Sequence, residues 1–198
     1  MSLRILRSGD SQRQPWANGD GSTRELMQWP GDGQPWQWRL SIADVDRDAP
    51  FSAFPGVDRI LVLLNGDGLV LRFADGREAR LDTPFALARF PGEAELSGGP
   101  IAGPTTDFNL MWQRDRFDAE LWVRPMVGSI QLFAAPGETW ALHVAAGHVD
   151  GDGRSLHLET GDTLVSIDDG SARRLHLDGA GTALAIRLKP LQERQHEG

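Results

Sequence analysis

The feature that most constrains the fold is a series of short segments with strand-type alternation, separated by strong turn signals. The segment WQWRLSIADV has apolar residues at positions 36, 38, 40 and 42, which alternate with residues 37, 39, 41 and 43 on the opposite face. The apolar run ILVLL is followed by the hairpin signal NGDG and by the alternating segment LVLRF. No apolar period of 3.6 residues lasts long enough for a major helix, and residues 115–119 are the one place where the pattern allows a short helix. An all-β sandwich or barrel is therefore predicted.

The two halves of the chain repeat one another. LLNGDG and LDTPFALARFPG in the first half are echoed by VAAGHV and LETGDTLVSIDDG in the second. Gly66 aligns with Gly147 and Thr83 with Thr163, at offsets of 81 and 80 residues. A chance echo in a glycine-rich β protein is the alternative, but repeats of this length are typical of duplicated domains. We therefore expect two related domains, residues 1–115 and residues 116–198.

Composition excludes several classes of function. The chain has no cysteine, which rules out disulfides, thiolate nucleophiles and cysteine-based zinc sites. Its net charge of -8 argues against a nucleic-acid partner. No segment approaches the ~20 apolar residues of a membrane span, and MSLRILRSGDSQRQ lacks the apolar region of a signal peptide. We expect a soluble, cytoplasmic protein without a membrane partner.

Several motifs resemble those of a known family. TGDTLVSIDDG resembles the second motif of the cupins, and PFALARFPG resembles it more loosely. Over roughly the first 115 residues, WANGDGSTREL, WRLSIADV, FSAFPGVDRILVLLNG and TTDFNLMW follow one another as in the HutD/Ves family of bicupins. The resemblance implies an all-β, double-stranded β-helix (the jelly roll of the cupins), duplicated as a bicupin. It also implies a setting beside bacterial histidine-utilisation enzymes, or a stress-response role as in the Ves branch.

The residues of a cupin metal site are missing from the first half. A metal-binding cupin supplies two histidines and a glutamate from its first motif and a further histidine from its second. Here the glutamate position resembles Arg59, whose charge would repel a divalent metal, and the late histidine position falls near Arg173. The histidines are His143, His148, His157, His176 and His196. Pairs such as His157 with Glu159 and His176 with Asp178 are common on solvated strands. We therefore expect no metal and no other cofactor.

The first barrel is better supplied with groups for binding an anion. Arg39 and Ser41 share a strand face, and Arg59 begins a strand that should line the same cavity. Forked guanidinium groups are suited to carboxylates, and an asparagine can recognise an amide. The predicted ligand-binding residues are Asn18, Thr23, Glu25, Arg39, Ser41, Phe51, Phe54, Arg59 and Asn109. The competing interpretation is structural, with Arg39 paired to Glu25, and Arg59 to Asp58 or another acid, as internal ties between strands.

Catalytic groups are scarce. Metal-free cupin enzymes use a histidine base, often with a tyrosine acid, and the chain has no tyrosine. The acids near the predicted cavity are Glu25, Asp44, Asp58 and Asp107, of which Glu25 is the candidate general base.

Several tryptophans are predicted to lie in the core, beside the pocket or at an interface. Trp36 and Trp38 are predicted to be core residues, and Trp16 is predicted either to flank the pocket or to anchor the N-terminal segment. Trp122 and Trp140 lie near the junction of the halves, where an interdomain or homodimer interface would suit them.

Three hypotheses follow. The first is a non-catalytic, metal-independent cupin that binds a small anionic metabolite, of the urocanate or N-formylglutamate type, and moderates histidine utilisation. The second is a metal-free enzyme acting on such a metabolite with Glu25 as base. The third is a protein-interaction or stress-response module of the Ves type.

Overall fold

The computed structural model describes residues 2–31, 33–151, 156–167 and 173–191. These residues form strands and turns, and none of them is helical, which confirms the all-β prediction. The short helix that the pattern allowed at residues 115–119 is not formed, because a turn at 114–116 leads directly into a strand. As the described residues contain no helix, no long apolar helix that could cross a membrane is found among them.

The chain divides into two compact units. The first consists of Ser11–Arg114, and the second combines Met1–Asp10 with Asp115–Gly198. Strands of the first unit are β2 (Arg13–Pro15), β3 (Gly21–Trp29), β4 (Trp38–Val45), β5 (Ala49–Pro50), β6 (Val57–Asn65), β7 (Leu69–Phe73), β8 (Glu78–Leu81), β9 (Leu87–Pro91), β10 (Leu96–Pro100) and β11 (Thr105–Gln113). Strands of the second are β1 (Ser2–Leu6), β12 (Phe117–Ala134), β13 (Thr139–Gly151), β14 (His157–Glu159), β15 (Thr163–Ile167) and β16 (Arg173–Pro190).

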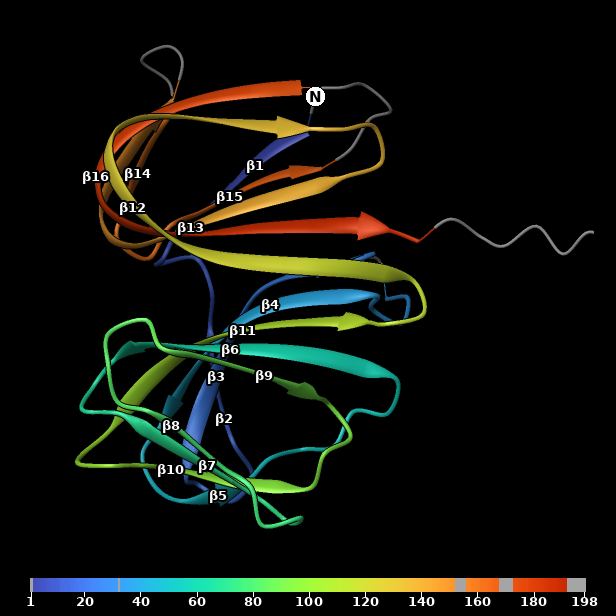
Figure 1. Cartoon of the computed structure of the whole chain (residues 1–198), viewed down its shortest axis with the longest axis vertical. Coiled ribbons are helices and arrows are strands. Elements are labelled where there is room, and N and C mark those ends of the chain that lie inside the picture. The colour runs from blue at the N-terminus through green and yellow to red at the C-terminus, as the bar shows by residue number, and fades with distance from the viewer. Residues whose placement is uncertain (1, 32, 152–155, 168–172, 192–198) are drawn as a thin grey trace, which may run out of the picture. The chain divides into compact units, whose positions relative to one another are not determined.

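The first unit is a two-sheet jelly roll. One sheet has the order β2-β3-β4-β11-β6-β9 and the other the order β5-β10-β7-β8, and the two lie as separate layers (Figure 1). Every pairing is antiparallel, as expected for short strands joined by glycine-containing turns. The core cluster takes its side chains from both sheets: Val45, Leu61, Leu63, Leu69, Leu71, Leu81, Phe90 and Leu96. The large sheet carries most of the side chains of the candidate functional site.

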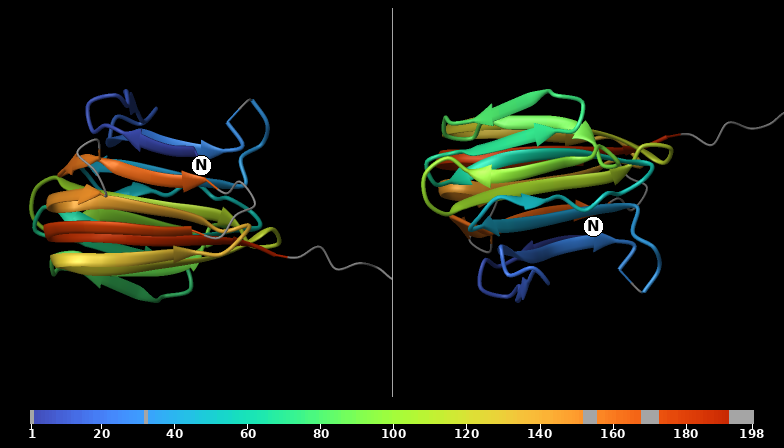
Figure 2. Two further views of the ribbon diagram at one scale, coloured as in Figure 1. Left: turned by 90° about the horizontal axis from the view of Figure 1, so that it is seen from above. Right: turned by 90° about the horizontal axis from the view of Figure 1, so that it is seen from below.

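The second unit is built from long strands that bend. Its sheet has the order β1-β15-β13-β16-β12, with β14 added to β13. In Figure 2 (left) the strands of this sheet follow one another from orange (β15) through red (β16) to yellow (β12). In Figure 1, β12, β13 and β16 curve together at one side of this unit. Gly147 and Gly181 face each other at the bend, where an added Cβ would lie 1.9 Å and 2.0 Å from backbone oxygens. Both have positive φ, so the bend requires glycine at these positions.

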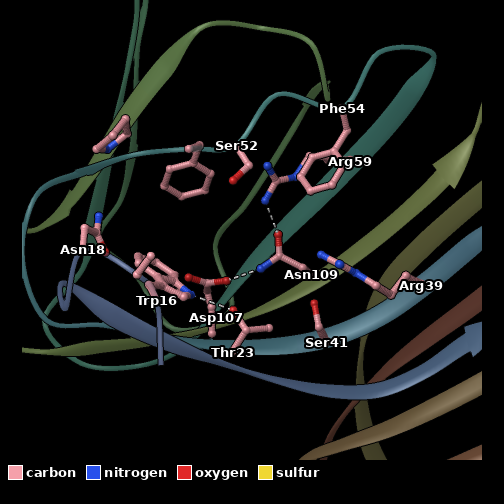
Figure 3. A pocket seen from close by; sticks show the side chains of 14 residues that line it. Trp16, Asn18, Thr23, Arg39, Ser41, Ser52, Phe54, Arg59, Asp107 and Asn109 are labelled. Carbon is pink, nitrogen blue, oxygen red and sulfur yellow. Dashed lines mark hydrogen bonds between the residues drawn. The ribbon is translucent and has the colours of Figure 1, made fainter. Parts of the chain in front are cut away.

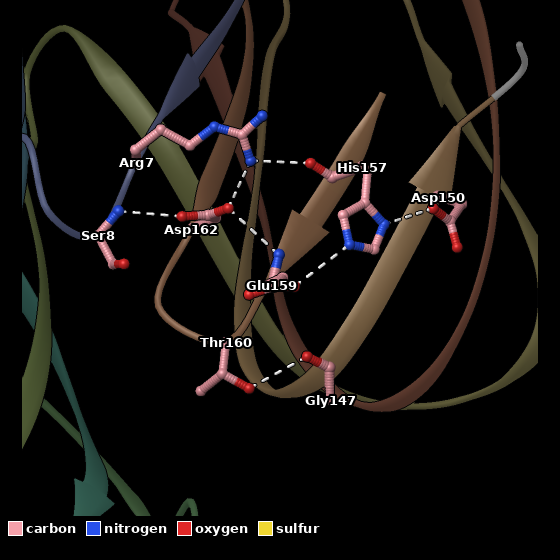
Figure 4. A network of polar contacts seen from close by, with 8 residues as sticks. All are labelled: Arg7, Ser8, Gly147, Asp150, His157, Glu159, Thr160 and Asp162. Carbon is pink, nitrogen blue, oxygen red and sulfur yellow. Dashed lines mark hydrogen bonds and ion pairs between the residues drawn. The ribbon is translucent and has the colours of Figure 1, made fainter. Parts of the chain in front are cut away.

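The N-terminal strand pairs within the second unit, which differs from the predicted boundary. We expected residues 1–115 to form one domain, but β1 pairs with β15 and Ile5 packs against that unit's core. Asp162 secures the end of β1, since it accepts hydrogen bonds from the Ser8 amide (2.9 Å) and from Arg7 (2.6 Å), as Figure 4 shows. Burial alone would raise the pKa of Asp162, but these hydrogen bonds and the Arg7 charge lower it overall.

Candidate functional site

The site is built from three rows of side chains across neighbouring strands of the large sheet. Because paired residues of antiparallel strands point to the same face, register determines which side chains meet. Thr23, Ala43 and Asp107 form the first row on β3, β4 and β11. Ser41 and Asn109 form the second row.

Arginines form the third row. Arg39 on β4 and Arg59 on β6 both pair with Met111, which lies between them on β11. The two guanidinium groups therefore reach the same face of the sheet as Asp107 and Asn109.

These rows form one wall of a cavity of about 420 Å³. Eight of the nine predicted residues line it: Asn18, Thr23, Arg39, Ser41, Phe51, Phe54, Arg59 and Asn109. Six residues outside the predicted set also line it: Trp16, Ala17, Ala43, Pro50, Ser52 and Asp107. Glu25 is exposed and is not among the lining residues, although its charge acts on Arg39.

The turn before β3 explains the motif WANGDGSTREL. Trp16 donates a hydrogen bond from its indole nitrogen to the Thr23 hydroxyl at 2.8 Å, which ties this turn to the first row. Gly21 makes the approach possible, since an added Cβ would lie 2.9 Å from the Trp16 ring and 2.4 Å from the carbonyl oxygen of Asp44. The turn holds Asn18 at the cavity, with its side-chain oxygen accepting from the Asp20 amide. Trp16 therefore both lines the pocket and anchors the turn.

A buried chain of hydrogen bonds links three of the lining side chains. Arg59 donates to the side-chain oxygen of Asn109 at 2.8 Å, and the Asn109 nitrogen donates to one oxygen of Asp107 (Figure 3). Arg59 is 6% exposed, Asn109 4% and Asp107 0%. Because the asparagine amide has both an acceptor and a donor, Asn109 bonds to the cation and to the acid at once and lies between them.

Both guanidinium groups are enclosed by aromatic rings. The Arg59 carbon Cζ lies 5.1 Å from the Phe51 ring centroid and 5.2 Å from that of Phe90. The Arg39 carbon Cζ lies 5.5 Å from the Trp36 ring centroid and 5.6 Å from that of Phe54. Trp36 thus covers an arginine and is half-buried, whereas Trp38 is fully buried as predicted for a core residue.

Neither arginine has a carboxylate partner within the described part of the chain. Asp58 instead pairs with Arg89 and Arg114, and the Nε atoms of Arg39 and Arg59 are buried without a hydrogen bond. Burial lowers the pKa of Arg59 to about 10, against the opposing influence of Asp107. Burial also lowers the pKa of Arg39, while the charge of Glu25 raises it. Two cations with unused donors therefore face one cavity.

Asp107 is the one carboxyl group in the lining, and it has an unusual environment. Burial raises its pKa to about 7, although the Arg59 charge and the Asn109 hydrogen bond both lower it. One of its oxygens, Oδ2, is buried without a hydrogen-bond partner. The sequence placed Asp107 among the acids near the cavity, and its alternation with Asn109 and Met111 is the signal that could have added it to the predicted lining.

Histidines and carboxylates elsewhere do not assemble a metal centre in the described residues. No group of three or more histidine, cysteine, aspartate or glutamate side chains there has the geometry to hold a metal ion. His157 contacts Asp150 at 2.7 Å and Glu159 at 3.5 Å on the exposed face of β14 (Figure 4). The side chain of Arg173, expected near the second cupin motif, lies outside what the structure describes.

Comparison with known proteins gives consistent matches over most of the chain. A family model described as HutD matches residues 8–185. An uncharacterized 21.2 kDa protein in the hutC 3' region of Pseudomonas putida is 38% identical over 179 residues, which cover 84% of this chain and 92% of that protein. Protein Ves of Citrobacter koseri is 35% identical over 111 residues, which cover 54% of this chain and 56% of that protein.

Solved structures agree on the fold. The structure of HutD from Pseudomonas fluorescens SBW25 superposes with a TM-score of 0.84 at 29% identity, covering 96% of this chain and 100% of that one. A bacterial pirin from Escherichia coli, solved in complex with nickel(II), gives a TM-score of 0.69 at 10% identity over 96% of this chain and 99% of that one. At that identity the likeness shows the fold alone.

Proposed function

The chain belongs to the HutD family, and on that basis we propose that it is a non-catalytic, metal-independent cupin that binds a small anionic metabolite and moderates histidine utilisation. The proposal places the ligand in the cavity of the first unit, with its carboxylate against Arg39 and Arg59.

One observation carries this proposal. The buried guanidinium group of Arg59 and the half-buried one of Arg39 share a cavity, and neither has a carboxylate partner among the described residues. Uncompensated buried charge is costly, and a bidentate carboxylate would satisfy both the charge and the free N–H groups. Since the aromatic rings cover guanidinium faces, the edges of these groups are what a ligand can reach. An anion therefore complements the site.

The donor set supports binding without metal and without catalysis. The cavity lining contains two arginines and one carboxyl group, and it contains no histidine, so a divalent cation would meet net positive charge and few ligands. A hydroxyl nucleophile such as Ser41 or Ser52 has no histidine beside it among the lining residues.

Family membership and one relative support the metabolic setting. The family is HutD, and the Pseudomonas putida relative is named for its place in the hutC 3' region. We propose ligands of the urocanate or N-formylglutamate type, because both carry a carboxylate for the arginines and a polar group that Asn109 or its neighbours can bind.

A thermal-shift screen tests the proposal. Urocanate, N-formylglutamate and related mono- and dicarboxylates would be added to the purified full chain, with divalent metals and a chelator as controls. A ligand at about 100 times its Kd stabilises a protein by about 2.7 kcal/mol, which corresponds to roughly 5–11 °C in Tm for a chain of this size. We expect Arg59→Met to remove this shift, whereas Arg89→Met, which removes an arginine of β9 outside the cavity, should retain it.

Four results would contradict parts of the proposal. If no carboxylate shifts the wild-type Tm, or if Arg59→Met retains the shift, the arginines are structural ties. If chelator alone lowers the Tm strongly, the protein depends on a metal. If a bound compound is consumed, as followed by chromatography, the protein is an enzyme, and because Glu25 is exposed, Asp107 would be the first base to test.

A further inference from the structure

The cavity has a second polar end, away from the arginines proposed to bind the ligand carboxylate. Asp107 is 0% exposed, and its Oδ1 accepts from Asn109 while its Oδ2 has no hydrogen-bond partner. Buried acceptors are rarely left unpaired, so this oxygen is a candidate contact for a ligand group. In Figure 3 the two carboxylate oxygens of Asp107 point in different directions, one toward Asn109 and the other toward the side of Trp16.

Hydrogen-bond donors and acceptors thus lie at different ends of the cavity. Arg59 offers donors at one end, Asn109 is oriented by its two hydrogen bonds, and Asp107 offers an acceptor at the other. Charged groups also act on Asp107 from the neighbouring strands, namely Arg59 on β6 and Asp44 on β4. A ligand with carboxylates at both ends would place negative charge beside Asp107, which is unfavourable at short range.

We propose that the cavity selects carboxylates that also carry an N–H donor. The carboxylate is held by Arg39 and Arg59, and the N–H group donates a hydrogen bond to Oδ2 of Asp107. This inference rests on the proposed function, because it assumes that the arginines bind a carboxylate. Asp107 and Asn109 are two residues apart on β11, so their backbones are about 7 Å apart, and Arg59 reaches the Asn109 side chain. A ligand with a few bonds between carboxylate and N–H can span that separation.

A matched pair of probes tests the inference. 3-(1H-Pyrrol-2-yl)propenoate and 3-(furan-2-yl)propenoate have the same shape and charge, but the first presents an N–H donor where the second presents an oxygen acceptor. Their Kd values would be measured by titration calorimetry on the full chain at pH 8, where Asp107, with a pKa of about 7, is mostly ionised. We expect wild type to bind the pyrrole at least about tenfold more tightly, because a hydrogen bond to a charged group is among the stronger ones.

Asp107→Asn is the decisive variant. Its side-chain oxygen can still accept from Asn109, which leaves the amide NH2 where Oδ2 was, so an acceptor becomes a donor. The preference for the pyrrole should therefore vanish or reverse in Asp107→Asn. Asp44→Asn is the matched control, since Asp44 is a nearby carboxylate outside the lining, and it should keep the wild-type preference.

The outcomes separate this inference from the proposed function. Equal binding of both probes to wild type, lost in Arg59→Met, overturns the inference and leaves the carboxylate site intact. Binding of other carboxylates but of neither probe also overturns it. If Asp107→Asn prefers the pyrrole over the furan as strongly as wild type does, a group other than Asp107 binds the N–H donor and the inference is overturned. If neither the probes nor any carboxylate of the thermal-shift screen binds, the proposed function itself fails.

Discussion

Substitution of Asp107 by asparagine should stabilise the ligand-free protein, and the gain should grow with pH. The folded-state pKa of Asp107 is raised to about 7 from an ordinary value of 3.8. Between these values the folded protein holds a proton that the unfolded chain has released, so wild-type stability falls as pH rises, by about 1.4 kcal/mol per pH unit. The loss accumulates to about 3 kcal/mol between pH 5 and pH 8, since it stops near the folded-state pKa.

The asparagine variant lacks this titration, while its other ionisable groups are those of wild type. The Tm difference between variant and wild type should therefore widen in favour of the variant by roughly 6–12 °C from pH 5 to pH 8, at about 2–4 °C per kcal/mol. Differential scanning fluorimetry without ligand across that pH range measures it. A difference that does not change with pH would refute the reasoning. A variant that becomes relatively less stable at pH 8 would show that ionised Asp107 and Arg59 stabilise each other as an ion pair.

Two further predictions concern the second unit. Asp162→Asn should lower the Tm by the equivalent of about 1–3 kcal/mol near pH 7, because Asp162 holds the end of β1, whereas Asp150→Asn at an exposed carboxylate should change it little. The pKa of Asp162 is lowered, so this cost should shrink as pH falls below about 4, which thermal unfolding at acid pH would detect. Gly181→Ala should destabilise more than Gly128→Ala, because both have positive φ but only Gly181 meets backbone atoms at the bend; chemical denaturation of both variants would show equal losses if the bend can relax.

Local pattern predicted the class of fold well. Alternation and turn signals depend on neighbouring residues, and they placed β4, β6 and β7 correctly because each strand has one face or both in a core. The repeat was less informative about local structure. Gly66 follows the end of β6, whereas Gly147 lies inside the bent strand β13, so residues that align in sequence share only a positive φ. The docking of β1 onto β15 is a long-range pairing, and nothing in the first ten residues specifies their partner.

The site shows the same division between local and long-range information. Arg39 and Ser41 could be placed on one face from their spacing alone, and Asn109 from its spacing with Met111. Glu25 pairs with Ser41 just before β3 shifts register, yet it is exposed and does not line the cavity, and register alone does not account for this.

The spacing between Arg59 and Asp107 explains why the cavity can remain receptive to an anion. A direct ion pair would satisfy the guanidinium with an internal carboxylate and leave little for a ligand, as Asp58 does for Arg114 at 2.9 Å. Asn109 prevents this by standing between the two groups and bonding to both. The acid still offsets part of the cost of burying Arg59, since its charge raises the arginine pKa against desolvation. At the same time the high pKa of Asp107 means that near neutral pH the offset is incomplete. Under the proposed function, an incoming carboxylate would meet a cation that is partly stabilised but not neutralised, so the ligand charge would still be needed to compensate Arg59.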